Sequence, residues 1–220
     1  MNRSTVSYLT GLLLLSLSFG SSLVQAGPTN IVLNGGFETG DLTGWTEKGD
    51  NTARCFPAVY VASLNQVTSF CNNSVSPFPP HSGQFAAFFQ NSAALGAGTI
   101  SQDLSTTPGT TYDLTFWLAS FADPILGQTP NQMIVDWGGL QVADIVNLST
   151  DGSYQQFSVN VLATGSSTLL SFVGTNDPNV TGLDDVSALA IATTSEPSSL
   201  MLLSTGVLAA LCLALKKAVA

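Results

Sequence analysis

Short runs in which apolar and polar residues alternate occupy the middle of this 220-residue chain. In Thr111–Phe121 (TYDLTFWLASF) and Tyr154–Leu162 (YQQFSVNVL), every second residue is apolar over most of the run. Because successive side chains of a strand point to opposite faces, this spacing indicates strands with one buried face and one solvated face. Nine runs are expected to form strands: Asn30–Leu33, Ala58–Ala62, Gln84–Phe89, Thr99–Leu104, Thr111–Phe121, Met133–Trp137, Tyr154–Leu162, Thr168–Val173 and Leu183–Ala190.

Residues that favour turns separate these runs, and no segment between Pro28 and Ala192 shows helical periodicity. Many short strands with Gly, Pro, Asn, Asp and Ser between them are typical of an all-β sandwich. A stretch of this length can bury one core between two sheets. We therefore predict a single β-sandwich domain over residues 27–192.

The N-terminal segment has the three parts of a secretory signal. Arg3 supplies the positive charge, Leu12–Leu17 the apolar core, and Val24–Ala26 the small residues before a cleavage site. An uncleaved membrane anchor is the alternative, but the apolar run is short and Gly20–Ser22 follows it. We predict a signal peptide over residues 1–26.

A second apolar segment stands near the C-terminus, after a polar linker at residues 193–199. Ser198–Leu215 carries no charge, and as a helix it would span about 27 Å, close to the ~30 Å hydrocarbon core of a bilayer. It has no polar stripe, which argues against a buried amphipathic helix. Lys216 and Lys217 should stay on the cytoplasmic side. We predict one transmembrane helix with its basic end over residues 198–217.

The order of these C-terminal features resembles the PEP-CTERM sorting signal of Gram-negative bacteria. The matching residues are Glu196 and Pro197, the apolar run after them, and Lys216 with Lys217. Ser195 stands where the family has its first proline, and lysines replace the usual arginines. The resemblance implies that the C-terminal helix anchors the chain in the inner membrane and that a membrane-embedded exosortase recognises this tail. It then cuts near the motif and releases the domain to the cell surface or biofilm matrix. Tails of this type are also classified as ice-binding protein C-terminal segments, although no threonine ladder repeats here.

Charge is strongly unbalanced once both ends are set aside. Between Gly27 and Ser195 there are thirteen acidic residues and only two basic ones, Lys48 and Arg54, for a net charge of −11. Such a surface repels phosphate backbones and anionic head groups, which argues against nucleic acid as a partner. It attracts divalent cations, and it also suits plain solubility outside the cell.

Two of the three cysteines, Cys55 and Cys71, lie in the exported part, and Cys212 lies in the apolar tail. In an exported domain, this pair is expected to form a disulfide that closes a surface loop. The bridge would stabilise the fold by about 3 kcal/mol. Two free thiols or a metal site are the alternatives, but two cysteines without a nearby histidine are a poor zinc site.

The segment Asn34–Trp45 (NGGFETGDLTGW) resembles the first-strand signature of galactose-binding-like jelly rolls, which include several carbohydrate-binding modules. Thr99–Leu118 is similar to the central strand pair of these domains, and Leu183–Leu189 to their last strand. The resemblance implies a jelly-roll β-sandwich. Phe37 and Trp45 are expected to pack in its core.

Glu38 follows a residue that we place in the core, so its carboxylate needs a partner. In the modules that the segment resembles, the equivalent Glu and an Asp of the last strand share a structural Ca²⁺ ion. Carried over, this implies that Glu38 and Asp184 are calcium ligands, with Asp185 as a weaker third candidate. A capped or solvated pair of acids is the alternative.

Catalytic signatures are scarce. The single histidine, His81, stands in the loop Pro77–Gly83, where a surface role is expected. The sequence has no Gly-x-Ser-x-Gly elbow, no His-rich metal spacing and no phosphate loop. We therefore expect a protein that is not an enzyme.

Sugar binding needs exposed aromatic rings beside hydrogen-bonding groups. Trp137, next to Asp136 and two glycines, and Phe78, in the proline-rich loop, are the rings that we expect to bind sugar. The expected function is contact with extracellular polysaccharide by an exported surface or matrix protein. A spacer or adhesin without sugar binding, or a polysaccharide hydrolase, is the alternative. The further aromatic candidates are Tyr60, Phe89 and Trp117.

Overall fold

The computed structural model of the chain describes residues 27–49, 58–63, 78–90, 96–121, 130–176 and 179–192, together with Gly206. Outside these ranges lie the predicted signal peptide, the predicted disulfide of Cys55 and Cys71, and the sorting residues Glu196, Pro197, Lys216 and Lys217. Within the ranges, no helix is long and apolar enough to cross a membrane.

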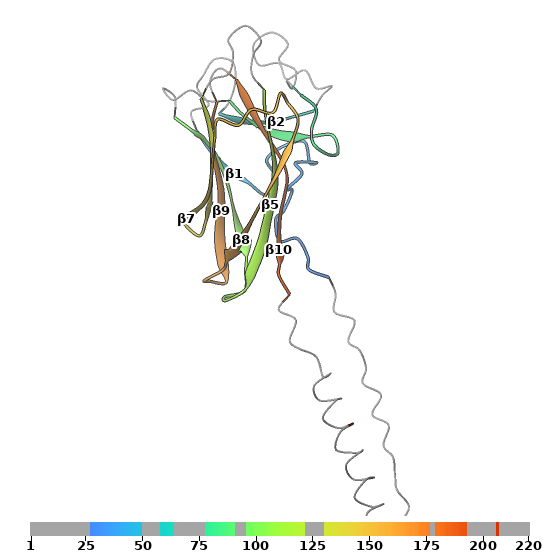
Figure 1. Cartoon of the computed structure of the whole chain (residues 1–220), viewed down its shortest axis with the longest axis vertical. Helices are drawn as coiled ribbons and strands as arrows, with labels where there is room; N and C mark the ends of the chain where they lie inside the picture. The colour runs from blue at the N-terminus through green and yellow to red at the C-terminus, as the bar shows by residue number, and fades with distance from the viewer. Residues whose placement is uncertain are drawn as a thin grey trace, which may run out of the picture.

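Two antiparallel five-stranded sheets face each other in the described chain (Figure 1). The first sheet has the order β1 (Thr46–Lys48), β4 (Gly98–Ser105), β9 (Ser167–Asn176), β6 (Asn131–Trp137) and β7 (Leu140–Val146). The second has the order β2 (Val59–Ala62), β3 (Ala86–Phe89), β10 (Val180–Ala190), β5 (Thr111–Phe121) and β8 (Gln155–Leu162). The chain passes repeatedly from one sheet to the other, so the fold is a jelly-roll β-sandwich, as predicted.

The alternation of side chains determines which face of each strand is buried. Along β5, Leu114, Phe116 and Leu118 are completely buried between the sheets, while Thr115 and Trp117 point outward and stay half-buried. Across the core, the ring of Phe116 meets that of Phe172 edge-on, with 5.3 Å between centroids. Aromatic pairs of this geometry add about 0.5–1.5 kcal/mol beyond the burial of their area.

Most of the predicted strands are confirmed, but one predicted strand is absent and two observed strands were not predicted. Asn30–Leu33 is not a strand, although its Ile31 amide donates a hydrogen bond to the Ala188 carbonyl at 3.2 Å. Two strands were missed by the sequence pattern. β1 has only three residues, and β7 is an edge strand whose side chains are largely exposed, so neither shows a buried alternating face.

Phe37 and Trp45 pack in the core as predicted. Phe37 is fully buried, Trp45 is nearly so, and their rings stack with 5.9 Å between centroids. The Trp45 indole nitrogen donates to the Asn34 carbonyl at 3.2 Å, and the Asn34 side chain donates to the carbonyls of Asp41 and Thr43. The NGGFETGDLTGW segment is therefore a compact turn that closes one side of the sandwich.

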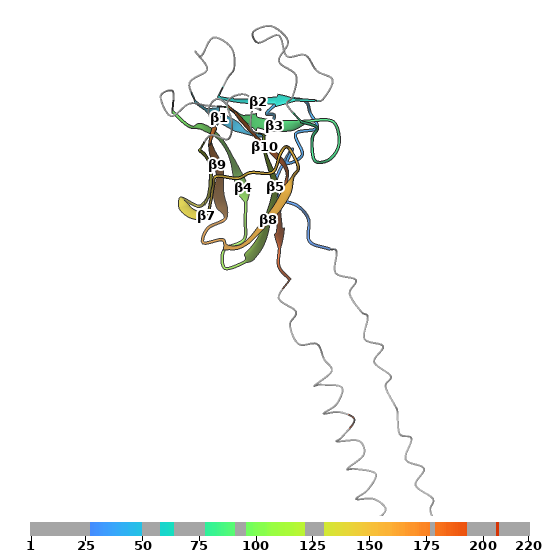
Figure 2. The same cartoon turned by 45° about the horizontal axis from the view of Figure 1, so that its top comes forward.

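A second, smaller hydrophobic cluster lies on the outer face of the second sheet. Phe88 packs there against Tyr60 and Phe78, and Phe78 packs against Tyr154. Figure 2 shows β2 and β3 side by side at the end of the sandwich that carries this cluster. Residues 78–85, called the 78–85 loop below, thus fold over part of the sheet and leave the rest of its outer face open.

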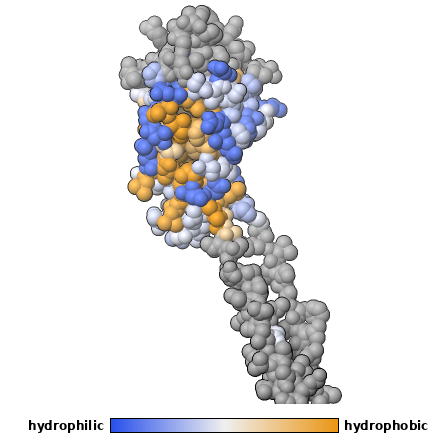
Figure 3. Space-filling model, viewed as in Figure 1, coloured by the Kyte–Doolittle hydropathy of each residue, from blue (hydrophilic) through white to orange (hydrophobic). Residues whose placement is uncertain are grey.

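The sandwich is also open along the side where the edge strands β7 and β8 meet. A groove there is lined by Val142 and Ile145 from β7 and by Phe157 and Val159 from β8, with Phe116 at its base. Figure 3 shows apolar residues along this face of the molecule, flanked by hydrophilic ones. In Figure 1 the start of the described chain and the end of β10 lie at the same end of the sandwich.

Candidate functional site

A bulge in β10 brings two adjacent carboxylates to the 78–85 loop. The register of β10 against β5 shifts between Asp184 and Ser187, and Asp185 has a φ of 47°. Asp184 is completely buried, and its Oδ2 accepts the amide hydrogens of His81 at 2.9 Å and Ser82 at 3.2 Å. Its Oδ1 accepts the Asp185 amide hydrogen at 2.8 Å. The buried carboxylate therefore fixes the loop backbone.

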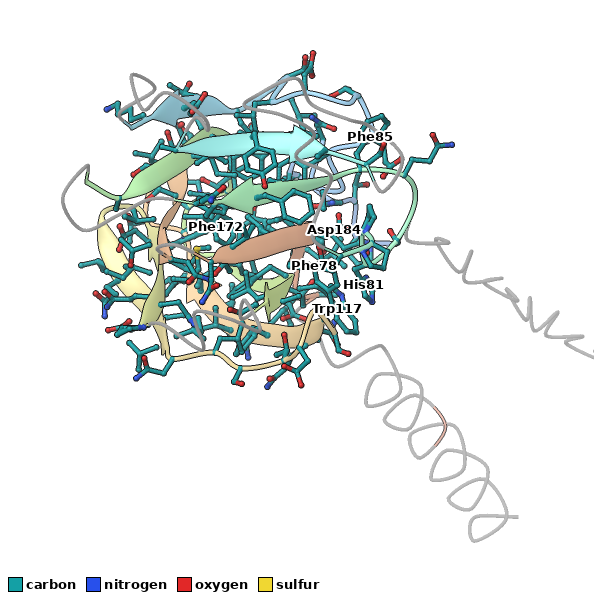
Figure 4. The ribbon with its side chains drawn as sticks, turned by 90° about the horizontal axis from the view of Figure 1, so that it is seen from above. Phe78, His81, Phe85, Trp117, Phe172 and Asp184 are labelled. Carbon is teal, nitrogen blue, oxygen red and sulfur yellow. The ribbon has the colours of Figure 1, made fainter. Side chains whose placement is uncertain are left out.

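Asp185 fixes two side chains of the same loop. Its Oδ2 lies 2.7 Å from His81 Nδ1, and its Oδ1 accepts the Ser82 hydroxyl at 2.8 Å. The His81 ring lies on the Trp117 indole, with 3.7 Å between centroids and 17° between planes. Figure 4 shows His81, Trp117, Asp184 and Phe78 gathered at one side of the sandwich. His81 is thus held between a carboxylate and an aromatic ring.

Glu38 holds the other end of the loop. Both of its carboxylate oxygens accept the Gln84 amide hydrogen at 3.0 Å, and Oε1 also accepts that of Phe85 at 3.1 Å. The approach needs a glycine at position 83, because a Cβ on Gly83 would stand 2.2 Å from Glu38 Oε1. The partner that Glu38 requires is therefore, in this structure, the loop backbone.

The electrostatics of the cluster follow from burial. Burial raises the pKa of Asp184 to about 7, amide hydrogen bonds from Ser82, Asp185 and His81 oppose the shift, and the Asp185 charge adds to it. Burial also raises the pKa of Tyr154, and the charges of Asp184 and Asp185 act in the same direction. The buried Tyr154 hydroxyl has no hydrogen-bond partner among the described residues.

The predicted calcium ligands Glu38 and Asp184 bind the same loop from two sides. Their oxygens have the hard chemistry that Ca²⁺ prefers, and each carboxylate has lone pairs beyond its amide bonds. Among the described residues, no three His, Cys, Asp or Glu side chains gather to hold a metal. The remaining ligands would be backbone carbonyls or water, and the calcium site stays a prediction.

The two rings chosen from the sequence as sugar platforms are buried, so their expected exposure is wrong. Trp137 is 4% exposed, points into the core as the last residue of β6, and donates from Nε1 to the Leu162 carbonyl at 3.1 Å. Phe78 is also 4% exposed, because the proline-rich segment folds back onto the second sheet. Neither ring offers solvent the face that stacking on a sugar needs.

The open part of the second sheet presents a different arrangement. Six outward-facing side chains on two neighbouring strands, called the Trp117 strip below, are Trp117, Thr115 and Asp113 of β5 and, directly opposite them, Gln156, Ser158 and Asn160 of β8. The Ser158 hydroxyl donates to Asp113 Oδ1 at 2.6 Å. One half-buried aromatic ring thus stands at the end of two rows of hydrogen-bonding groups.

A nucleophilic serine needs its hydroxyl hydrogen-bonded to a base, whereas the Ser82 hydroxyl donates to Asp185 and not to His81.

The sequence contained a signal for the Trp117 strip, because Trp117 shares its parity along β5 with Thr115 and Asp113, not with Leu114 and Phe116. That parity places it on the polar face.

No protein-family model matches the chain, and no curated protein matches it in sequence. Among solved structures, a cyclase from Fischerella sp. TAU is similar at 17% identity and a TM-score of 0.50, over 76% of this chain and all of that one. TmCBM61 in complex with β-1,4-galactotriose is similar at 19% identity and a TM-score of 0.49, over 74% of this chain and 99% of that one. The CBM22-1 xylan-binding domain of Paenibacillus barcinonensis Xyn10C has 17% identity and a TM-score of 0.49, over 77% of this chain and all of that one. At these identities the likeness concerns the fold alone.

Proposed function

We propose that this chain is an exported, non-catalytic β-sandwich that contacts polysaccharide through the Trp117 strip. The observation that carries the proposal is the placement of one half-buried aromatic ring, covered on one face by His81, beside rows of hydroxyl, amide and carboxylate groups on the outer face of the sheet. A sugar ring has apolar C–H faces and a rim of hydroxyls. A surface that recognises it combines an aromatic face with a few placed polar groups.

Contacts with the 78–85 loop hold the Trp117 ring of the strip in place. His81 lies on Trp117, Asp185 holds His81, and the Asp184 carboxylate holds the loop backbone. A ring fixed in this way loses little conformational freedom on binding, so less of the interaction free energy is offset by ordering. The contacts of His81 and Asp185 with Trp117 and its loop therefore favour recognition of an extended sugar chain by a pre-formed surface.

Export and sorting complete the proposal. The signal peptide at residues 1–26 carries the chain out of the cytoplasm, and the C-terminal helix holds it in the inner membrane for an exosortase-type enzyme. The domain is then displayed at the cell surface or in the extracellular matrix. Mass measurement of protein from the culture medium tests this step: an end near Pro197 supports sorting, and an intact tail found in membranes leaves a simple anchor.

Affinity electrophoresis in gels that contain neutral polysaccharides tests the binding surface. Trp117→Ala should abolish retardation, and Trp117→Phe should keep part of it because a ring remains. Gln132→Ala is the matched control, since Gln132 faces outward on the first sheet. Retardation that survives Trp117→Ala in folded protein would contradict the proposed surface.

A further inference from the structure

The carboxylates of Asp113 and Asp185 are acidic groups in and beside the Trp117 strip among the residues that the structure describes. Asp113 lies within the strip, and Asp185 lies beside Trp117 on the neighbouring strand. Among the described residues the only Lys or Arg is Lys48, which belongs to β1 at the edge of the other sheet. His81 can carry a positive charge, but its Nδ1 is already bound to Asp185. Among the described residues of this surface, an acidic sugar would therefore meet no Lys or Arg.

We infer that the Trp117 strip selects polysaccharides that carry protonated amino groups. The inference rests on the proposed function and names the class of glycan for that surface. An ammonium group on a sugar donates charge-assisted hydrogen bonds to a carboxylate, and these are stronger than bonds between neutral groups. Asp113 Oδ1 already accepts the Ser158 hydroxyl, so the carboxylate is oriented and keeps lone pairs for such a donor.

The neighbours of Asp113 extend this acceptor site. Asn160 lies directly opposite Asp113 on β8, and its amide oxygen is a further acceptor on the same face. An ammonium group has three donors, so Asp113, Asn160 and solvent together can satisfy it. A neutral acetamido group has a single N–H and no charge, and it would gain much less at the same place.

The spacing of the strip requires a chain and not a single sugar. Trp117 and Asp113 are four residues apart on β5, which places them about 13 Å from each other along the strand. A ligand that stacks on Trp117 and reaches Asp113 with an amine must therefore be an oligosaccharide. Glucosamine alone can occupy only one end of the strip.

Two oligosaccharides that differ only in acetylation test the inference. The full-length chain, purified in a polyoxyethylene detergent, is titrated calorimetrically with a chitosan oligosaccharide and with its fully N-acetylated counterpart of equal length. We expect the amine form to bind about tenfold more tightly, in line with a charge-assisted hydrogen bond. Added salt should weaken the binding of the amine form only.

Two matched variants test whether Asp113 causes the preference for the amine form. Asp113→Asn should remove the preference for the amine form, so that the ratio of the two affinities falls from about ten to about one. Asp103→Asn makes the same change of net charge on the outer face of the first sheet, and it should keep the preference. Equal effects of the two variants would overturn the inference, because general surface charge would then explain the preference.

The wild-type comparison keeps the test independent of how the variants fold. If the wild-type chain binds both oligosaccharides equally well, the inference fails while the proposed function stands. If it binds neither of them, nor any neutral polysaccharide, the proposed function itself fails.

Discussion

The imidazole of His81 lies almost parallel to the indole of Trp117, with 3.7 Å between the ring centroids. The two residues belong to different parts of the chain: His81 to the 78–85 loop and Trp117 to β5 of the second sheet. Because Asp184 and Asp185 hold the loop, the orientation of Trp117 depends on carboxylates that need not touch a ligand. A change in the contacts of the loop is therefore expected to change the orientation of Trp117.

Replacement of His81 tests whether its contacts with Trp117 and Asp185 stabilise the fold. His81→Ala removes an aromatic contact worth about 0.5–1.5 kcal/mol and a partly exposed ion pair worth about 0–1 kcal/mol. A loss of this size lowers the melting temperature of a domain of this length by about 1–10 °C. His81→Phe keeps the stack without the ion pair, so calorimetric melts should place it between His81→Ala and the wild type. Equal melting temperatures of all three proteins would show that the contacts of His81 do not stabilise the fold.

Gly83 tests the hold of Glu38 on the loop. Gly83 has a φ of 60°, and an added Cβ would meet Glu38 Oε1, whereas Gly109 has a φ of 78° and open space around it. Gly109→Ala should therefore cost only the backbone strain, about 1–2 kcal/mol. Gly83→Ala should cost clearly more in urea unfolding, because the carboxylate must also move. If both variants lose the same stability, the Glu38 contact contributes nothing.

The fold was accessible from the sequence because its signal is local. Alternation in Thr111–Phe121 and Tyr154–Leu162 gives each strand and its buried face, and the same parity places Trp117 outside. The site depends on contacts that no local pattern encodes. His81 and Asp184 are 103 residues apart, and they meet only because β10 bulges at Asp185.

The choice of Trp137 and Phe78 failed for a related reason. Trp137 borders a glycine pair that suggests an exposed turn, but its parity along β6 matches that of the buried residues Met133 and Val135. Phe78 lies among prolines typical of a surface loop. That loop folds back onto Phe88 and Tyr154, which are brought near it only by the tertiary structure.

The raised pKa of Asp184 predicts a pH dependence of stability. Its pKa rises from an ordinary value of 3.8 to about 7 in the fold, so the folded state favours the protonated acid. The contribution of this group to stability is full below about pH 4 and is lost as the pH rises through about 7. Asp184→Asn should therefore gain stability relative to the wild type between these limits. Calorimetric melts across this range measure the difference.

The control for that experiment is Asp103→Asn, since Asp103 is an exposed acid on the first sheet. Its melting curve should follow that of the wild type at every pH. A constant difference in stability between Asp184→Asn and the wild type would contradict the shifted titration of Asp184.

The calcium site predicted from the sequence can be tested by melting experiments on the wild type and on variants of its carboxylates. A buried carboxylate is costly to ionise, and a cation bound beside Asp184 and Glu38 would offset that cost while the amide bonds persist. A ligand that binds only the folded state raises the melting temperature by mass action. The wild type should therefore melt higher with Ca²⁺ than with EGTA, and Glu38→Gln should lose most of the difference. Asp103→Asn should keep it. A wild-type midpoint that does not respond to EGTA removes the calcium site and leaves both carboxylates as anchors of the loop backbone alone.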